Sequence, residues 1–465
     1  MKRSEVAFLV AAAIATGSIV AARNMTASTT EANVADAGRF LSAGWYCPSP
    51  AQDGIDAFMG TANLGADPVH LQRRAIGGGA VSVGKGADLA ATRRDVVDIA
   101  DFGVSSPTGL TEAFGAATTS DELAVGKGVG VALSRCSLQP WDTWYFPTAS
   151  TAKGSGSNSL LLANPFDEEA VFSARIMTAG GPQSPALLRN IVVPRLTQLR
   201  VNLDEAVRET PTFGVEVRVT MGRVIAANMV RFTTRDLHHG LSLDVGVRTP
   251  SPSWYLAGGI IPPTGEEFLD LVNPGDREAL VAVVFQLSDQ QIAPDALQEL
   301  AVAAGSKVRV RLRDFIPVGS YHGIAVTTLN ETRIVAGSQI IDDAPGGGGA
   351  ENVSGAPEPS ERWVVPVGSH LGGDEIAISV ANPATTSTKI SITLIDAQGI
   401  RTPQELKSIR VDGGRVVLID LRPYVQGSAT AIVRALADGK VAVQSLLRLG
   451  PPYQDFASSS GQIFD

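Results

Sequence analysis

The chain has 465 residues, enough for about three globular domains of ordinary size. Hydrophobic residues make up 44% and charged residues 18% of the sequence, a composition typical of a folded globular protein. The net charge is −9, and no basic stripe with interleaved aromatic residues occurs, which argues against nucleic acid as a partner.

The N-terminus has the pattern of an export signal. Lys2 and Arg3 precede an uncharged run, residues 6–22, which fits either a cleaved signal peptide or a short membrane anchor. The positive-inside rule places the chain beyond this run outside the cytoplasm. We expect residues 1–39 to form this hydrophobic helix and a short linker, with membrane contact through residues 6–22 if the segment is not cleaved.

Beyond this segment the sequence repeats one pattern. Each repeat opens with a tryptophan and then reaches an asparagine at the end of an apolar strand. The tryptophans are Trp45, Trp144, Trp254 and Trp363, and the asparagines of the three regular copies are Asn164, Asn273 and Asn382. Successive asparagines are 109 residues apart (273 − 164 and 382 − 273). A fixed period of this length indicates domain-sized units copied in tandem, each large enough to bury its own core.

The first unit, residues 40–140, is diverged, because its asparagine, Asn63, is not followed by proline. It contains both cysteines of the chain, Cys47 near its start and Cys136 near its end. The first and last strands of a β-sandwich can lie close together, so we expect a disulfide, which would contribute about 4–5 kcal/mol in the chain-entropy model. Two free buried cysteines are the alternative. A zinc site is not supported, because paired ligand spacing is missing.

Runs of alternating apolar and polar residues recur in the later units. Residues 195–203, 307–312 and 415–421 are equivalent examples, and such alternation is typical of half-buried strands. About seven short strands per unit, with few helical patterns, predict an all-β fold. We expect a tandem array of about four antiparallel immunoglobulin-like β-sandwich domains behind the N-terminal hydrophobic helix.

The boundaries of the later units follow from the repeat and from composition. We place unit 2 at residues 141–236, unit 3 at residues 237–341 and unit 4 at residues 362–450. Residues 342–361 are rich in glycine and proline and predict a flexible linker. Residues 451–465 are predicted to be a C-terminal tail. The last unit is therefore expected to move relative to the others.

The chain also resembles a known family. The resemblance rests on the Trp-Tyr-Cys-Pro start at Trp45, the second cysteine at 136, the Trp-Tyr-Phe-Pro module at Trp144 and its Asn-Pro strand. These features resemble an uncharacterised family of secreted actinobacterial proteins, a domain of unknown function, over most of residues 40–450. The resemblance implies exported, membrane- or wall-associated β-domains, and it brings no active site with it.

Candidate chemistry is sparse. The repeat tryptophans could stack on sugars, but their equivalent positions favour packing in the cores. Trp141 has no counterpart in other units and is predicted to pack a joint between units. His238 and His239 would point to opposite faces of an extended segment, so they make a poor metal site. Ser155 and Ser369 lie in glycine-containing loops without a nucleophile-elbow motif. We predict no catalytic residue, no cofactor and no metal.

These observations favour an exported, non-catalytic protein that acts as an interaction or scaffold component of the cell envelope, either secreted or membrane-anchored. The alternative is a carbohydrate- or cell-wall-binding module that uses exposed aromatic residues. An enzyme with an unrecognised site in the first two units is a third hypothesis. The expected partner is an envelope protein or a cell-wall glycan.

Overall fold

The computed structural model describes residues 42–52, 54–115, 117–153, 156–233, 239–344 and 348–464. The predicted N-terminal helix within residues 1–39 lies outside the described residues. The helical elements of the described chain are short: α3 (Leu203–Ala206) and the 3₁₀ turns η2 (Ile99–Phe102), η3 (Ala186–Leu188), η4 (Asp295–Leu297), η5 (Leu312–Asp314) and η6 (Gln404–Leu406). None of them has the length and apolar character needed to cross a membrane.

The described chain is otherwise built from antiparallel sheets that occur in four pairs, which confirms the all-β prediction. In unit 1 the five-stranded sheet contains β1 (Ser42–Pro48), β7 (Thr108–Phe114), β3 (Val69–Gly77), β4 (Ala80–Val83) and β5 (Ala87–Leu89). The four-stranded sheet contains β6 (Arg94–Asp98), β2 (Asp56–Asn63), β8 (Thr118–Gly126) and β9 (Gly130–Arg135).

Unit 2 repeats this arrangement. Its five-stranded sheet contains β10 (Thr143–Ala149), β16 (Phe213–Met221), β12 (Ala170–Thr178), β13 (Gly181–Gln183) and β14 (Ile191–Val193). Its four-stranded sheet contains β15 (Thr197–Asn202), β11 (Ser157–Asn164), β17 (Ile225–Thr233) and β18 (His239–Val245).

Units 3 and 4 follow the same order. The five-stranded sheet of unit 3 contains β19 (Ser253–Ile260), β25 (Tyr321–Thr328), β21 (Ala279–Gln286), β22 (Gln291–Ile292) and β23 (Leu300–Val302). Its four-stranded sheet contains β24 (Ser306–Arg311), β20 (Gly265–Asn273), β26 (Val335–Asp342) and β27 (Gly349–Ser354). The six-stranded sheet of unit 4 contains β28 (Arg362–Val367), β34 (Ala429–Leu436), β30 (Thr388–Ile395), β31 (Ile400–Arg401), β32 (Ile409–Val411) and β37 (Gln462–Ile463). Its four-stranded sheet contains β33 (Arg415–Asp420), β29 (Glu375–Asn382), β35 (Ala442–Leu449) and β36 (Asp455–Ser460).

Each pair of sheets forms a β-sandwich-like unit, but its strand order differs from the immunoglobulin order. In immunoglobulin domains the first two strands share a sheet. Here β1 and β2 lie in different sheets, and β2 pairs with β6 and β8. The immunoglobulin-like part of the prediction is therefore corrected, whereas the three predicted alternating runs do form the equivalent strands β15, β24 and β33.

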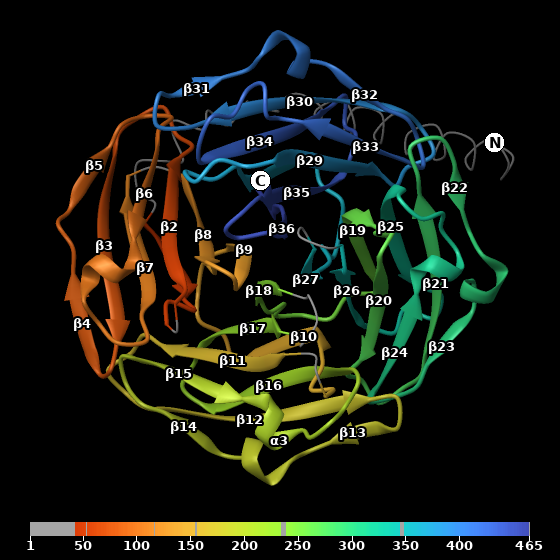
Figure 1. Cartoon of the computed structure of the whole chain (residues 1–465), viewed down its shortest axis with the longest axis horizontal. Helices are drawn as coiled ribbons and strands as arrows, with labels where there is room; N and C mark the ends of the chain where they lie inside the picture. Colours follow the sequence, from red (N-terminus) through yellow and green to blue (C-terminus); the bar gives the residue numbers. More distant parts are fainter. Residues whose placement is uncertain are drawn as a thin grey trace, which may run out of the picture.

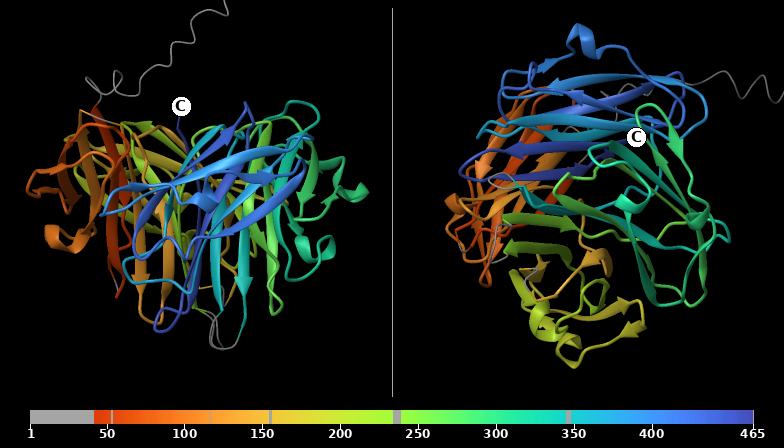
Figure 2. Two further views of the ribbon diagram at one scale, coloured as in Figure 1. Left: turned by 90° about the horizontal axis from the view of Figure 1, so that it is seen from above. Right: turned by 45° about the vertical axis from the view of Figure 1, so that its right-hand side comes forward.

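The four units surround a common axis and close into a ring (Figure 1). Seen from the side, the ring is a thick disc (Figure 2). Unit 4 meets unit 1 across a joint with no chain connection, where Leu123 and Leu133 of unit 1 belong to the same apolar cluster as Val365 of unit 4. The array is therefore a closed ring of mutually packed units.

The last strand of each four-stranded sheet lies nearest the axis (Figure 1), and we call β9, β18, β27 and β36 the axial strands. The boundaries predicted for three of these strands are wrong. β18 follows the boundary placed at residue 236, β27 lies in the predicted linker, and β36 lies in the predicted tail. β27 and β36 carry serine, asparagine and acidic residues because they face neighbouring units, so the apolar alternation of a half-buried strand is missing. Unit 4 is held in the ring by these contacts.

Candidate functional site

The axial strands begin at a buried carboxylate. The Oδ2 atom of Asp455, the first residue of β36, accepts hydrogen bonds from the backbone N–H groups of Val131 (2.8 Å) and Leu241 (2.9 Å). Its Oδ1 atom accepts one from the N–H group of Ala350 (3.1 Å). One side chain therefore ties together the axial strands of all four units. Burial raises the pKa of Asp455 well above its usual range, against the effect of these hydrogen bonds.

Other carboxyl groups are buried near the axis. Burial raises the pKa of Glu122 to about 8 and that of Glu351 to about 8. Glu351 accepts a hydrogen bond from the Ser458 hydroxyl (2.8 Å), which in turn accepts one from Gln444 (2.7 Å). Between them these residues cross the joint of units 3 and 4. The neutral form of each carboxyl is favoured, since an unpaired charge is costly in a buried position.

At the other end of the axial strands is a cavity of about 360 Å³, which we call the axial mouth. All four units line it, with residues that include Arg135, Trp144, Arg248, Trp254, Trp363 and Gln462. Arg248 is exposed, and its guanidinium lies 5.2 Å from the ring centre of the half-buried Trp141. Trp141 thus lies at the joint of units 1 and 2, beside the mouth.

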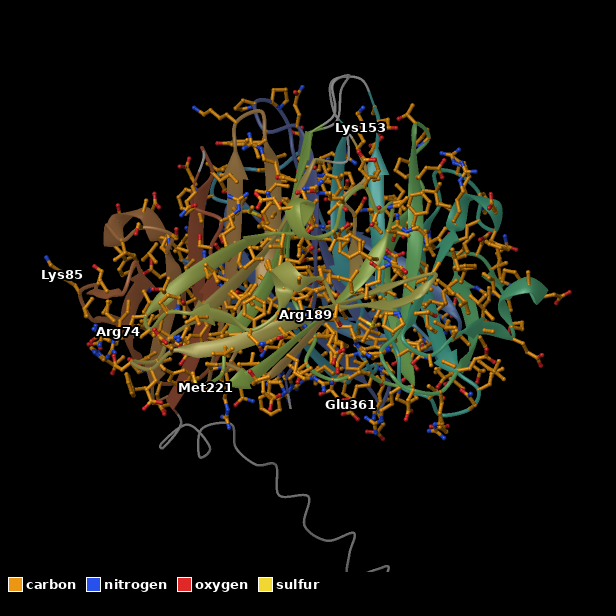
Figure 3. The ribbon with its side chains drawn as sticks, turned by 90° about the horizontal axis from the view of Figure 1, so that it is seen from below. Arg74, Lys85, Lys153, Arg189, Met221 and Glu361 are labelled. Carbon is orange, nitrogen blue, oxygen red and sulfur yellow. A yellow bond between two sulfur atoms is a disulfide. The ribbon has the colours of Figure 1, made fainter. Side chains whose placement is uncertain are left out.

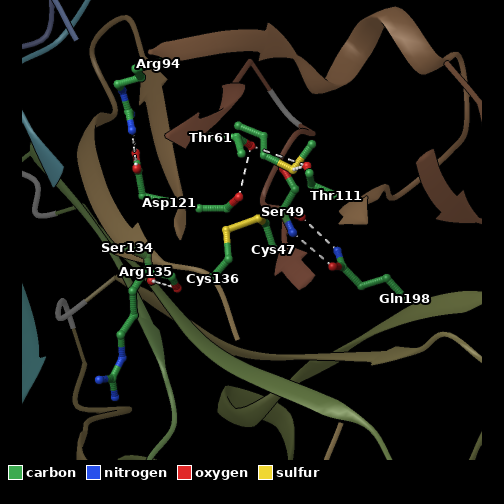
Figure 4. The surroundings of a disulfide bond; sticks show 12 residues. Cys47, Ser49, Thr61, Arg94, Thr111, Asp121, Ser134, Arg135, Cys136 and Gln198 are labelled. Carbon is green, nitrogen blue, oxygen red and sulfur yellow. Dashed lines mark hydrogen bonds and ion pairs between the residues drawn. A yellow bond between two sulfur atoms is a disulfide. The ribbon is translucent and has the colours of Figure 1, made fainter. Parts of the chain in front are cut away.

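Arg135 is the last residue of β9, next to the disulfide between Cys47 and Cys136. This disulfide was expected from the sequence and is present. Figure 4 shows the Arg135 side chain pointing away from the disulfide. The described residues provide no hydrogen bond or ion pair to its guanidinium. Burial lowers the pKa of Arg135 and nearby Arg248 adds to this effect, whereas the charge of Asp244 opposes it.

One equivalent position contributes a side chain to every joint between units. In each unit this residue pairs across the sheet with the residue before the repeat asparagine (Asn63 in unit 1): Arg94, Gln198, Lys307 and Val416 in units 1 to 4. Each of these side chains lies at the joint with the preceding unit. The four residue types differ completely, so each joint has its own chemistry.

The closing joint and the joint of units 2 and 3 use cations. Arg94 makes two hydrogen bonds to Asp121 (2.6 and 2.7 Å) and reaches Thr430 of unit 4 (2.8 Å). Lys307 is fully buried and donates to the carbonyl oxygen of Phe213 in unit 2 (3.1 Å). Burial lowers the pKa of Lys307 to about 7, although its ion pair with an aspartate opposes this shift.

At the other two joints the residue at this position is neutral. Gln198 accepts hydrogen bonds from the N–H group of Ser49 (3.0 Å) and the hydroxyl of Thr108 (2.7 Å), and it donates to the carbonyl oxygen of Ser49 (2.8 Å). Val416 instead packs in a small apolar cluster with Ala257 of unit 3. The side chain at this position therefore forms hydrogen bonds at the joint of units 1 and 2 and packs against apolar residues at the joint of units 3 and 4.

The repeat tryptophans lie in the cores of the units, and each is at most 2% exposed. The indole N–H group donates to an equivalent backbone carbonyl in three units: Val224 for Trp144, Ile334 for Trp254 and Val441 for Trp363. In unit 1 the acceptor is the Thr118 hydroxyl. Trp144, Trp254 and Trp363 line the axial mouth, but they offer little surface to a ligand.

The repeat asparagines are buried and bind the turn that follows them. Asn273 donates from Nδ2 to the carbonyl oxygens of Arg277 (2.7 Å) and Val302 (2.9 Å), and its Oδ1 accepts from the N–H group of Gly275. Equivalent bonds are made by Asn164, Asn382 and the diverged Asn63. The side-chain amide is thus the shared structural feature, with or without the proline after it.

The remaining candidates do not come together as a site. Ser155 and His238 lie outside the described residues. Ser369 is buried, and its hydroxyl accepts a hydrogen bond from the N–H group of Leu371. A buried His322 lies 3.3 Å from Glu267, a pair that sequence analysis did not single out. The described part of the chain contains no group of three or more histidine, cysteine or acidic residues placed to hold a metal ion.

Sequence reasoning also missed Asp455 and Arg135. Neither belongs to the repeat, since the positions equivalent to Asp455 are glycines, Gly130, Gly240 and Gly349. The signal for Asp455 in the sequence is a charged residue at a position where the other three units have glycine. This signal becomes visible only when the four axial strands are known to be equivalent.

The comparisons with known proteins give a family, and solved structures match parts of the chain. Among solved structures, Thermotoga maritima 1070 is 19% identical with a TM-score of 0.22, and the match covers 24% of this chain and 97% of that one. The Anabaena sensory rhodopsin transducer is 26% identical with a TM-score of 0.17, covering 19% of this chain and 96% of that one. No curated protein matches the sequence. The model of the Family of unknown function (DUF5719) matches residues 91–239 and 248–463, so the chain belongs to this family.

Proposed function

We propose that the protein is an exported, non-catalytic scaffold of the cell envelope that contacts the envelope through one face of its ring. Export, and the actinobacterial source suggested by the resemblance, are part of this proposal. The observation that carries it is a set of large apolar side chains exposed at one hairpin position. These are Phe114, Met221 and Leu329, which are 46%, 52% and 54% exposed.

The three residues are equivalent in the fold. Phe114 and Met221 end β7 and β16, and Leu329 directly follows β25, so each begins the turn that leads into the four-stranded sheet. Unit 4 has Leu436 at this position, where it is partly buried. Core packing explains why apolar residues are buried. It does not explain why a large apolar side chain is exposed at the same turn in three units. Repeated exposure of this kind is typical of a contact surface.

These turns lie on the face where the axial mouth opens, which we call the mouth face. Met221 and Glu361 are seen at this face in Figure 3, and Lys153 at the opposite one. Ser42 pairs with Phe114 at the same edge of unit 1. An N-terminal anchor would therefore be attached beside the mouth face and would hold that face toward the membrane.

The alternative, a glycan-binding module, needs exposed aromatic residues. The repeat tryptophans are buried, so they supply no such surface, and the exposed phenylalanines, Phe114 and Phe166, lie in different units. Among the tryptophans only Trp141 is half-exposed, and its ring is already stacked with Arg248. We therefore prefer the scaffold.

Cosedimentation of the ring, residues 40–465, with envelope fragments of the native host tests this proposal. Omitting the apolar N-terminal run prevents it from dominating the binding. The variant Phe114→Ser, Met221→Ser, Leu329→Ser should bind at least about tenfold more weakly, because it loses the apolar contact area. A matched control replaces three rim residues of comparable exposure, Val83 (60%), Leu187 (65%) and Ile400 (50%), by serine and should bind normally. Equal binding by both variants would contradict the proposal.

A further inference from the structure

We infer that the axial mouth binds an oxyanion, a phosphate or carboxylate group, held by the guanidinium groups of Arg135 and Arg248. The inference deepens the proposed function. It rests on that function only in that the mouth opens at the centre of the proposed contact face. The ligand site itself can be tested without the envelope.

The first argument is the unpaired state of Arg135. Its guanidinium carries five N–H donors, and a partly buried guanidinium normally finds a carboxylate or several carbonyl groups. The two most buried arginines of the described chain each have a carboxylate partner, because Arg94 is paired with Asp121 and Arg73, through one of its nitrogens, with Asp95. Within the described residues Arg135 has no hydrogen-bonding partner. A planar fork of donors in a cavity matches a bidentate oxyanion.

The second argument is the balance of charge around the mouth. Arg135 and Arg248 are close enough that each charge opposes the other, and Asp244 is the acidic group that acts on Arg135. The Asp244 carboxylate already accepts a hydrogen bond from the Ser354 hydroxyl (2.5 Å). Burial raises the pKa of Asp244 to about 6, so part of its negative charge is lost in mildly acid solution. Arg135 and Arg248 carry two positive charges and Asp244 carries at most one negative charge, so the net charge of these three groups is positive.

The third argument is that the site is rigid and has room. A cavity of about 360 Å³ is at the lower end of small-ligand sites and exceeds the size of one phosphate. Next to Arg135, the backbone is fixed by the disulfide at Cys136 and by two hydrogen bonds that join Ser137 to Tyr46 (2.8 Å each). Because the backbone is already ordered, little conformational entropy is lost when an anion binds.

Finally, neither arginine belongs to the repeat. The positions equivalent to Arg135 in the other axial strands are Val245, Ser354 and Ser460. A residue needed for folding of each unit would recur, as the tryptophans do. Arg135 comes from unit 1 and Arg248 from the segment after unit 2, so the oxyanion site exists once in the ring.

The test is isothermal titration calorimetry of the purified ring with sodium pyrophosphate and with sodium citrate at constant ionic strength. A parallel arm measures binding to vesicles that contain phosphatidylglycerol, with neutral vesicles as reference. The variant Arg135→Met keeps an unbranched, flexible side chain similar to the aliphatic part of arginine and removes the guanidinium group. The control Arg189→Met removes an exposed arginine of the outer rim, seen in Figure 3. Circular dichroism establishes that both variants are folded.

We expect Arg135→Met to weaken binding at least tenfold in the arm that shows binding, whereas Arg189→Met leaves it unchanged. Binding of citrate or pyrophosphate would identify a soluble anion, and binding of the charged vesicles alone would identify a lipid headgroup. The inference is overturned if the wild-type ring binds none of these probes, or if Arg135→Met binds them as well as the wild type. Envelope binding through the apolar turns is measured separately, so the two proposals can fail independently.

Discussion

The cores of the four units and the joints between them differ in how much of their chemistry repeats. Each core uses a buried tryptophan with a paired indole N–H group and a buried asparagine that binds the following turn. Each joint uses a different residue at one equivalent position: Arg94, Gln198, Lys307 or Val416. The four cores therefore use the same kinds of contact, whereas each joint has a different residue at the equivalent position.

This difference has a physical reason. Identical joints would allow any unit to pair with any other, including a unit of a second chain, because specificity requires a difference in free energy between right and wrong partners. The closing joint needs such specificity most, since no chain segment connects unit 4 to unit 1. There Arg94 reaches Thr430, a contact that a glutamine or a valine would not reproduce. The differing joints therefore specify the order of the ring.

Replacing a repeat tryptophan should have the largest effect on stability. We expect Trp254→Ala to lower the free energy of unfolding by about 3–5 kcal/mol, because it leaves a cavity and removes the indole hydrogen bond to the Ile334 carbonyl. Trp144→Ala and Trp363→Ala should cost similar amounts if the cores are alike. Urea denaturation followed by circular dichroism measures all three. Costs that differ by more than about 2 kcal/mol would break the equivalence of the cores.

The contrast between cores and joints also explains which parts of the structure the sequence could predict. Periodicity revealed the strands that carry Trp254 and Asn273, because the same burial is required in every unit. The disulfide of Cys47 and Cys136 could be predicted because both residues lie at the ends of one unit. β27 and β36 were assigned to a linker and a tail, since strands that face other units carry polar residues.

The candidate site lay beyond this reasoning for the same cause. Arg135 and Asp455 work only because four strands meet on one axis, and no local pattern marks that meeting. Ring closure is a property of the joints, where equivalent positions have nothing in common. The repeat pattern reveals residues that recur in every unit, whereas the candidate site is formed by residues that each occur in one unit only.

Among the joint residues, Glu351 should have the next largest effect, and it makes stability depend on pH. Its pKa is about 8 in the folded protein and 4.5 ordinarily, so the folded state keeps a proton that the unfolded chain loses. Stability should therefore fall as the pH rises from about 5 to 8, by up to about 1.4 kcal/mol per unit. Glu351→Gln should remove this slope and gain about 2–3 kcal/mol at pH 7.

Unfolding measured at pH 5, 7 and 9 checks the prediction for Glu351. Glu122→Gln should act in the same direction, because burial also raises the pKa of Glu122 to about 8. The exposed Glu361→Gln controls for the loss of one negative charge. A slope that is unchanged in Glu351→Gln would show that this carboxyl is solvated and that the joint of units 3 and 4 is open.

Asp455 offers a test of the axis itself. Asp455→Gly makes the fourth axial strand like the other three, and it leaves three backbone N–H groups without an acceptor. We expect a loss of about 2 kcal/mol, smaller than three full penalties because a buried carboxyl is removed as well. Hydrogen exchange of the Val131, Leu241 and Ala350 amides should accelerate together. Unchanged protection of these amides would mean that the axis is held by other contacts.

The smallest effect is expected where a joint relies on neutral hydrogen bonds. Gln198→Leu removes three hydrogen bonds at the joint of units 1 and 2 and leaves the Ser49 N–H and carbonyl groups buried without partners. The expected loss is about 1–2 kcal/mol, because leucine recovers part of it through apolar burial.

The reciprocal change, Val416→Gln, decides whether joint chemistry is transferable. It places the amide of unit 2 at the equivalent position of unit 4, where Ala257 and Ala442 offer no polar partner. If local partners determine the outcome, both variants lose stability in urea denaturation, although each introduces a residue that an equivalent position already accepts. If Val416→Gln instead costs nothing, the small apolar cluster admits water, and the joint of units 3 and 4 does not contribute to the order of the ring through this residue.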